Sequence, residues 1–130
     1  MPNFSKESID NLNTAHPILK ELFEEVVKYF DCKVLCGHRG KEEQDKAFTE
    51  GKSKLKFPKS KHNSNPSLAV DVYPYPIDFK DIKRFYMFIG FVKGIATSKG
   101  IKIRTGGDWD GDTQVKDETF IDLPHFELIL

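Results

Sequence analysis

Apolar residues recur with helical spacing in the first third of the chain. Ile18, Leu22 and Val26 lie four residues apart, and this repeat predicts a helix over residues 15–29. Thr14 precedes that stretch and has a side chain that N-cap positions favour, so we expect it to cap the helix.

Two further segments predict helices. In residues 78–98, apolar residues again recur at helical spacing, over a longer stretch. Residues 42–50 are mostly polar and are followed by Gly51, the residue type that most often ends a helix. Residues 6–12 are expected to form only a short turn, which Ser5 can cap.

Short apolar runs between these helices predict strands. The runs are residues 32–36, 68–73, 101–104 and 126–130. The intervening segments 51–65 and 105–118 are polar and are expected to be loops. Helices and short strands in this order predict an α+β fold, with about three helices packed around a small, mainly antiparallel sheet. A chain of 130 residues can bury its own core, so we expect one domain over residues 1–130.

Composition narrows the classes of function. The net charge is +0 at pH 7, so no overall attraction to nucleic acid or anionic lipid is expected. No segment approaches the ~20 apolar residues that span a bilayer, and the first residues lack the apolar core of a signal peptide. We expect a protein that is made in the cytoplasm, does not insert into membranes and is a monomer.

Three residues have the side chains of a metal site. Asp71 interrupts an apolar run, and a buried ionised carboxylate must be paired or metal-bound. With His62 and His125 it provides the two imidazoles and one carboxylate of a catalytic zinc site, which leaves a fourth position for water. Asp122 is the candidate general base. Residues three apart face opposite sides of an ideal strand, but Pro124 predicts a bend that turns Asp122 toward His125.

These residues occur in recognisable motifs. The motifs are Ser60-x-His62, Ala69-x-Asp71 and Asp122-x-x-His125-Phe-Glu. Together they resemble the zinc D,D-peptidases and L-alanyl-D-glutamate endopeptidases of the D-alanyl-D-alanine carboxypeptidase type. The upstream Gly37-His-Arg39-x4-Gln44 is similar to the segment with which that family binds substrate through Arg and Gln.

The resemblance implies a role for each residue. His62, Asp71 and His125 would bind Zn²⁺ in a cleft, and Asp122 would carry a proton from water to the leaving amine. Arg39 would stabilise the oxyanion or hold the substrate carbonyl, as a fixed multi-donor group can.

Gln44 and Ser60 would hold the substrate through hydrogen bonds. An Asp at position 122, where the carboxypeptidase branch has Glu, resembles the endopeptidase branch. The implied protein is a bacteriophage endolysin that cuts the L-alanyl-D-glutamate bond of peptidoglycan stem peptides after release from the host cytoplasm. It would be a single peptidase domain without a separate wall-binding domain.

Two other functions fit parts of the sequence. A D,D-carboxypeptidase or D,D-dipeptidase would use the same zinc site on D-Ala-D-Ala ends. A non-enzymatic binding module would instead use the basic loop before and around His62. The lysines of that loop are Lys52, Lys54, Lys56, Lys59 and Lys61.

Structural roles are open for several of the same residues. Arg39 can form a salt bridge, with Asp71 as a partner, and Ser60 can cap its own backbone. His16 and His38 are expected to be hydrogen-bonded structural residues, and Trp109 a core or cleft-wall residue. The segment Asp108–Asp112 has the carboxylates of a calcium site, although a solvated acidic loop is the favoured interpretation.

Overall fold

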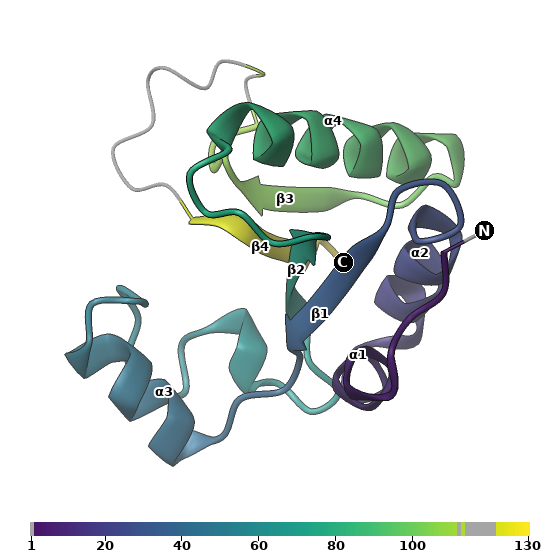
Figure 1. Ribbon diagram of the computed structural model, residues 1–130. Helices are drawn as coiled ribbons and strands as arrows, with labels where there is room; N and C mark the ends of the chain where they lie inside the picture. Colours follow the sequence, from purple (N-terminus) through teal and green to yellow (C-terminus); the bar gives the residue numbers. More distant parts are fainter. Residues whose placement is uncertain (1, 112, 114–121) are drawn as a thin grey trace.

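The computed structural model describes residues 2–111, 113 and 122–130, and its centre is an antiparallel sheet (Figure 1). The four strands lie in the order β1-β2-β4-β3. Their bounds are β1 (Cys32–Cys36), β2 (Ala69–Pro74), β3 (Ile103–Gly106) and β4 (Asp122–Leu128). The predicted α+β class is therefore confirmed, with β4 beginning four residues earlier than expected.

Four helices and one short 3-10 helix complete the described fold. They are α1 (Lys6–Leu12), α2 (Pro17–Val26), α3 (Lys41–Thr49), η1 (Lys61–Asn63) and α4 (Ile82–Ser98). Residues 6–12 form a helix rather than only the expected short turn, and Ser5 caps it, as predicted, by accepting a hydrogen bond from the Ser8 amide. Segment 51–65 was predicted to be entirely loop, but it contains η1. Among the described residues, no helix is long and apolar enough to cross a membrane.

The prediction that Thr14 caps the second helix is wrong. The helix begins at Pro17, and its N-cap is His16, whose Nδ1 accepts a hydrogen bond from the Ile18 amide at 3.1 Å. The Thr14 hydroxyl is already engaged: it donates to the Asn11 carbonyl and accepts from the His38 amide, both at 2.7 Å. The helix also ends at Val26 rather than residue 29.

One face of the sheet packs into the hydrophobic core. Val70 and Val72 of β2 and Phe126 of β4 are completely buried, and the core includes side chains of α2 and α4. The Phe126 ring lies 5.3 Å from the ring of Phe23 in α2 and 5.9 Å from that of Phe88 in α4. Alternating residues of β2 and β4 therefore anchor the sheet beneath the helices.

The other face of the sheet carries polar side chains. Strand side chains alternate between faces, so Asp71 points away from Val70 and Val72. Strands β2 and β4 pair in a register that puts Asp71 directly opposite His125. The sequence alternation and the strand pairing together place these two candidate ligands side by side.

Strand β4 is irregular just before His125. Thr105 of β3 pairs with Phe126, but the next residue, Gly106, pairs with Asp122. Residues 123–125 of β4 are thus left out of its ladder with β3, as in a large bulge. A Cβ at Gly106 would collide with the Asp122 carbonyl oxygen, so the close approach needs glycine. The bend predicted near Pro124 is confirmed.

Candidate metal centre

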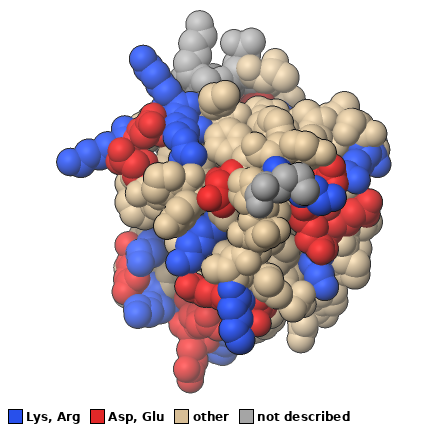
Figure 2. Space-filling view, turned by 45° about the vertical axis from the view of Figure 1, so that its right-hand side comes forward, with Lys and Arg blue, Asp and Glu red and all other residues tan. Residues whose placement is uncertain are grey.

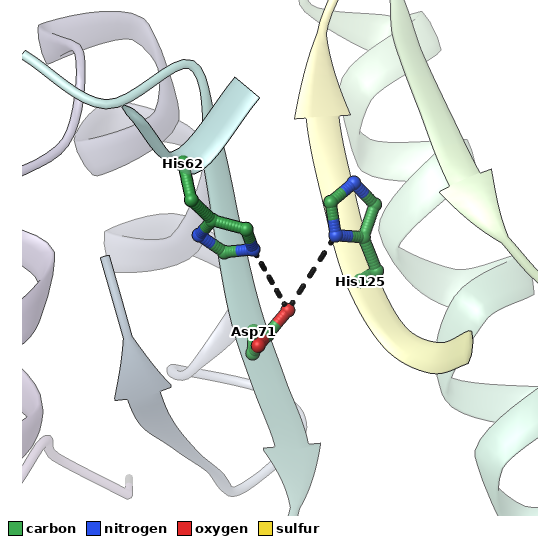
Figure 3. Close-up of side chains that lie close together, drawn as sticks. All are labelled: His62, Asp71 and His125. Atoms are coloured by element: carbon green, nitrogen blue, oxygen red, sulfur yellow. Dashed lines mark hydrogen bonds and ion pairs between the residues drawn. The ribbon is translucent and has the colours of Figure 1, made fainter. Parts of the chain in front are cut away.

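The side chains of His62, Asp71 and His125 converge at one point (Figure 3). They come from η1, β2 and β4, and their ligand-type atoms all lie within 4.8 Å of one another. Oδ1 of Asp71 lies 3.2 Å from Nε2 of His62 and 3.6 Å from Nδ1 of His125. Two imidazole nitrogens and one carboxylate oxygen form a donor set that could hold a metal ion.

His62 is oriented by a backbone acceptor. Its side chain is 1% exposed, and its Nδ1 donates to the Gly37 carbonyl at 2.8 Å. A carbonyl oxygen can only accept, so Nδ1 carries the hydrogen and Nε2 is the nitrogen directed at Asp71. This arrangement resembles the hydrogen bond that fixes the ring of a metal-ligating histidine.

Charges inside the cluster alter the pKa values of its members in the absence of an ion. Burial favours a neutral Asp71, but the charges and hydrogen bonds of His62 and His125 hold its pKa well below the ordinary value. Burial would also lower the pKa of His62, but Asp71 outweighs it and raises that pKa to about 10. The pKa of His125 is raised against burial by hydrogen bonds with Asp71 and Glu127. The metal-free cluster therefore holds protons where a cation would bind.

Asp122 lies beside this cluster and is a suitable base. Its Oδ2 is 4.0 Å from Nδ1 of His125, and its side chain is 28% exposed. Burial, and next the negative charge of Asp71, raise the pKa of Asp122 from 3.8 to about 6. A carboxylate with a pKa close to neutrality can accept a proton and release it again.

Arg39 contacts the cluster through Asp71. Its Nη2 lies 3.4 Å from Oδ2 of Asp71, and its Nη1 donates to Oε1 of Gln44 at 3.0 Å. The salt bridge considered from the sequence is therefore present. Arg39 also lines the cleft over the cluster, so a contact with substrate stays a prediction.

Gln44 is completely buried within the protein. Its Nε2 donates to the Leu55 carbonyl at 2.6 Å and to Oγ of Ser53 at 2.9 Å, while its Oε1 accepts from Arg39. Gln44 holds Arg39 in place, and direct substrate binding by Gln44 stays a prediction. Ser60 lines the cleft and also caps η1, with Oγ accepting from the amide of residue 62 at 3.2 Å.

The cluster lies in a cleft of about 800 Å³. One part of the lining is basic and comes from the predicted loop: Lys52, Lys54 and Lys61. Another part is aromatic: Tyr73, Phe79 and Trp109. The cleft-wall prediction for the tryptophan is confirmed, and its ring lies 5.0 Å from that of His125. On the molecular face in Figure 2, basic and acidic side chains are interspersed.

Other polar residues singled out in the sequence lie outside the cluster. His16 caps α2, and Nδ1 of His38 lies 2.9 Å from the Ser64 carbonyl, so both are structural, as predicted. Asp108 was expected in a solvated loop, but it is 4% exposed and accepts a hydrogen bond from the Thr113 amide at 2.9 Å. Asp112, the far end of the calcium candidate, lies outside the described residues.

Glu127 is a functional candidate that the sequence analysis missed. It is 5% exposed and lies on the same face of β4 as His125, with its Oε1 2.8 Å from Nε2 of that histidine. A charged residue within the apolar end of β4 was the available signal, the same signal that identified Asp71.

Three kinds of comparison with known proteins give matches. A family model for the phage L-alanyl-D-glutamate peptidase matches residues 2–129. The L-alanyl-D-glutamate peptidase of Escherichia phage T5 is 30% identical over 135 residues, which cover 97% of each chain. The fold is similar to the crystal structure of the L-Ala D-Glu endopeptidase ChiX from Serratia marcescens. That match has a TM-score of 0.73 at 23% identity, over 98% of this chain and 90% of the other.

Proposed function

Because the chain belongs to the family of phage L-alanyl-D-glutamate peptidases, we propose that it is a zinc-dependent endolysin. It hydrolyses the bond between L-alanine and D-glutamate in the stem peptides of bacterial peptidoglycan, at the wall of an infected host. The observation that carries this proposal is the convergence of His62, Asp71 and His125 beside the carboxylate of Asp122.

The residues fit zinc by their chemistry and by their orientation. His62 would bind it through Nε2, His125 through Nδ1 and Asp71 through Oδ1, the atoms that already face one another. Three protein ligands would leave a position open for water. Zinc bound there would supply Lewis-acid activation of water and of the scissile carbonyl.

Asp122 moves the proton that the reaction requires. Water adds to the carbonyl carbon of L-alanine, and Asp122 accepts the proton that the water loses. As the C–N bond breaks, Asp122 donates that proton to the nitrogen of D-glutamate, which leaves as an amine. In the metal-free protein the pKa of Asp122 is about 6, so the carboxylate is ionised at neutral pH and is available to accept a proton.

Arg39 and its partners position the substrate. The guanidinium of Arg39 lines the cleft, and Gln44 fixes one of its nitrogens, so its other donors are presented in a defined orientation. We infer that Arg39 holds the substrate carbonyl oxygen as negative charge develops on it. Ser60 lies at the same cleft and would accept or donate one hydrogen bond to the peptide.

The products identify the bond that is cut. We expect mass spectrometry of digested peptidoglycan to show new D-glutamate N-termini, whereas free D-alanine would mean a D,D-carboxypeptidase. Metal analysis of the purified protein should find about one zinc per chain. Asp122→Ala should retain zinc and lose lysis, and His125→Ala should lose both.

A non-enzymatic module would give a different result. Its binding to DNA or wall polymer would persist in chelator and weaken with salt. The proposed peptidase would instead stop clearing a peptidoglycan suspension when chelator is added, and would resume when zinc is restored. Full lysis by the Asp122→Ala variant would remove that residue from the mechanism.

A further inference from the structure

Glu127 is a charged side chain buried directly behind one candidate ligand. Its Oε1 lies 2.8 Å from Nε2 of His125, and its Oε2 lies 2.9 Å from Nη2 of Arg104. A buried carboxylate is costly unless each oxygen is paired, and here both have a donor. The buried carboxylate of Glu127 is therefore stabilised by one donor on each oxygen.

The carboxylate determines which nitrogen of His125 is available. A carboxylate accepts hydrogen bonds, so Nε2 of His125 carries a hydrogen, and Nδ1 is the nitrogen left to offer a lone pair to a metal. His62 shows the opposite choice: its Nδ1 donates to the Gly37 carbonyl and its Nε2 faces the cluster. Each imidazole is thus oriented by the acceptor that its second nitrogen contacts. The charged acceptor of His125 forms the stronger hydrogen bond.

Arg104 keeps the carboxylate in place. Arg104 of β3 and Glu127 of β4 are cross-strand partners in the ladder. The guanidinium of Arg104 also lies 5.3 Å from the ring of Trp109, which in turn contacts His125. These four side chains, His125 included, form a closed ring of contacts, and the pairing of β3 with β4 holds two of them side by side.

We propose that Glu127, held by Arg104, is the positioning residue that fixes the orientation and tautomer of His125 for metal binding through Nδ1. This inference rests on the proposed zinc function. It adds that the metal affinity depends on a residue that is not itself a metal ligand.

The test compares zinc affinity among variants, measured by competition with a chromophoric chelator. Glu127→Ala should bind zinc about 10–100-fold more weakly than the unaltered protein, which is the usual effect of losing such a partner. Glu127→Gln keeps one acceptor oxygen and should bind only several-fold more weakly. Arg104→Gln should also weaken binding, by less than Glu127→Ala. Glu7→Gln removes an equal charge from an ion pair with Lys33, away from the site, and should have no effect.

A second measurement separates positioning from general damage. Long-range ¹H–¹⁵N spectra of the zinc-loaded protein should show the hydrogen of His125 on Nε2, and Glu127→Gln should weaken that hydrogen bond. Circular dichroism in chelator establishes that each variant is folded. If Glu127→Ala fails to fold, the zinc affinities of Glu127→Gln and Arg104→Gln test the inference instead.

The inference is overturned if folded Glu127 variants bind zinc as tightly as the unaltered protein, or if His125 carries its hydrogen on Nδ1. Failure of the proposed function would look different. In that case the unaltered protein itself would bind no zinc or release no D-glutamate N-termini.

Discussion

Replacing Asp122 with asparagine should abolish hydrolysis and stabilise the metal-free protein. Burial and the charge of Asp71 raise the pKa of Asp122 to about 6, so the folded protein disfavours the ionised form. The ordinary value of 3.8 applies to the unfolded chain. Above pH 6 the ionised carboxylate therefore costs stability, and this cost disappears as the pH falls toward 3.8.

The size of the effect follows from that shift. A change of about two pKa units corresponds to about 3 kcal/mol, at 1.36 kcal/mol per unit. The side chain is 28% exposed, and solvent screening reduces the expected gain to about 1–2 kcal/mol. For a domain of this length, that gain raises the melting temperature by about 3–8 °C.

Thermal unfolding in chelator at pH 7.5 and at pH 4 measures the effect. Asp122→Asn should melt higher than the unaltered protein at pH 7.5, and the difference should shrink at pH 4. Asp10→Asn, on the exposed face of α1, provides a matched loss of one carboxylate from a surface pair. It should change stability by less than about 1 kcal/mol.

The reasoning is refuted if Asp122→Asn is no more stable than the unaltered protein at pH 7.5. A gain of equal size at both pH values would also refute it, because electrostatic relief must follow the titration. Retained hydrolysis by the folded variant would instead contradict the role of Asp122 as the base.

Three further predictions concern the metal and the fold. Zinc binding at pH 7 should release at least one proton, because Asp71 raises the pKa of His62 to about 10 and that imidazole is therefore protonated in the metal-free protein. Calorimetry in buffers of different ionisation enthalpy counts the released protons, and no release would contradict a protonated His62. Phe126→Ala should cost about 3–5 kcal/mol in urea unfolding, because the ring is completely buried between two helices. Gly106→Ala should lower hydrolysis more than zinc affinity, because its Cβ collides with the Asp122 backbone and displaces the base; equal activity would show that the bulge is dispensable.

Local patterns explain why the elements and Asp71, one of the candidate metal ligands, could be predicted. We recognised the helical repeat of Ile18, Leu22 and Val26, and the apolar strand around Asp71, from residues that are close in the sequence and share one face of an element. A carboxylate among buried residues predicts a paired or metal-bound group, whatever the fold of the rest of the chain. The motif resemblance then assigned the two histidines, which spacing alone would not have distinguished from structural ones.

Helix ends were predicted less well, for a specific reason. Thr14 is a good N-cap by its own chemistry, but its hydroxyl is taken by Asn11 and by the amide of His38 after β1. The contact with His38 exists only once the strand has docked, so the local sequence around Thr14 holds no sign of it. His16 then caps the helix in its place.

The sequence by itself determined the α+β class, because period-two and helical patterns act between neighbours in the chain. Its motifs identified the metal-site candidates. Only the tertiary structure decided that β2 pairs with β4 so that Asp71 faces His125, and that Arg104 binds Glu127. These are contacts between distant segments. They depend on strand register and packing, which no local pattern specifies.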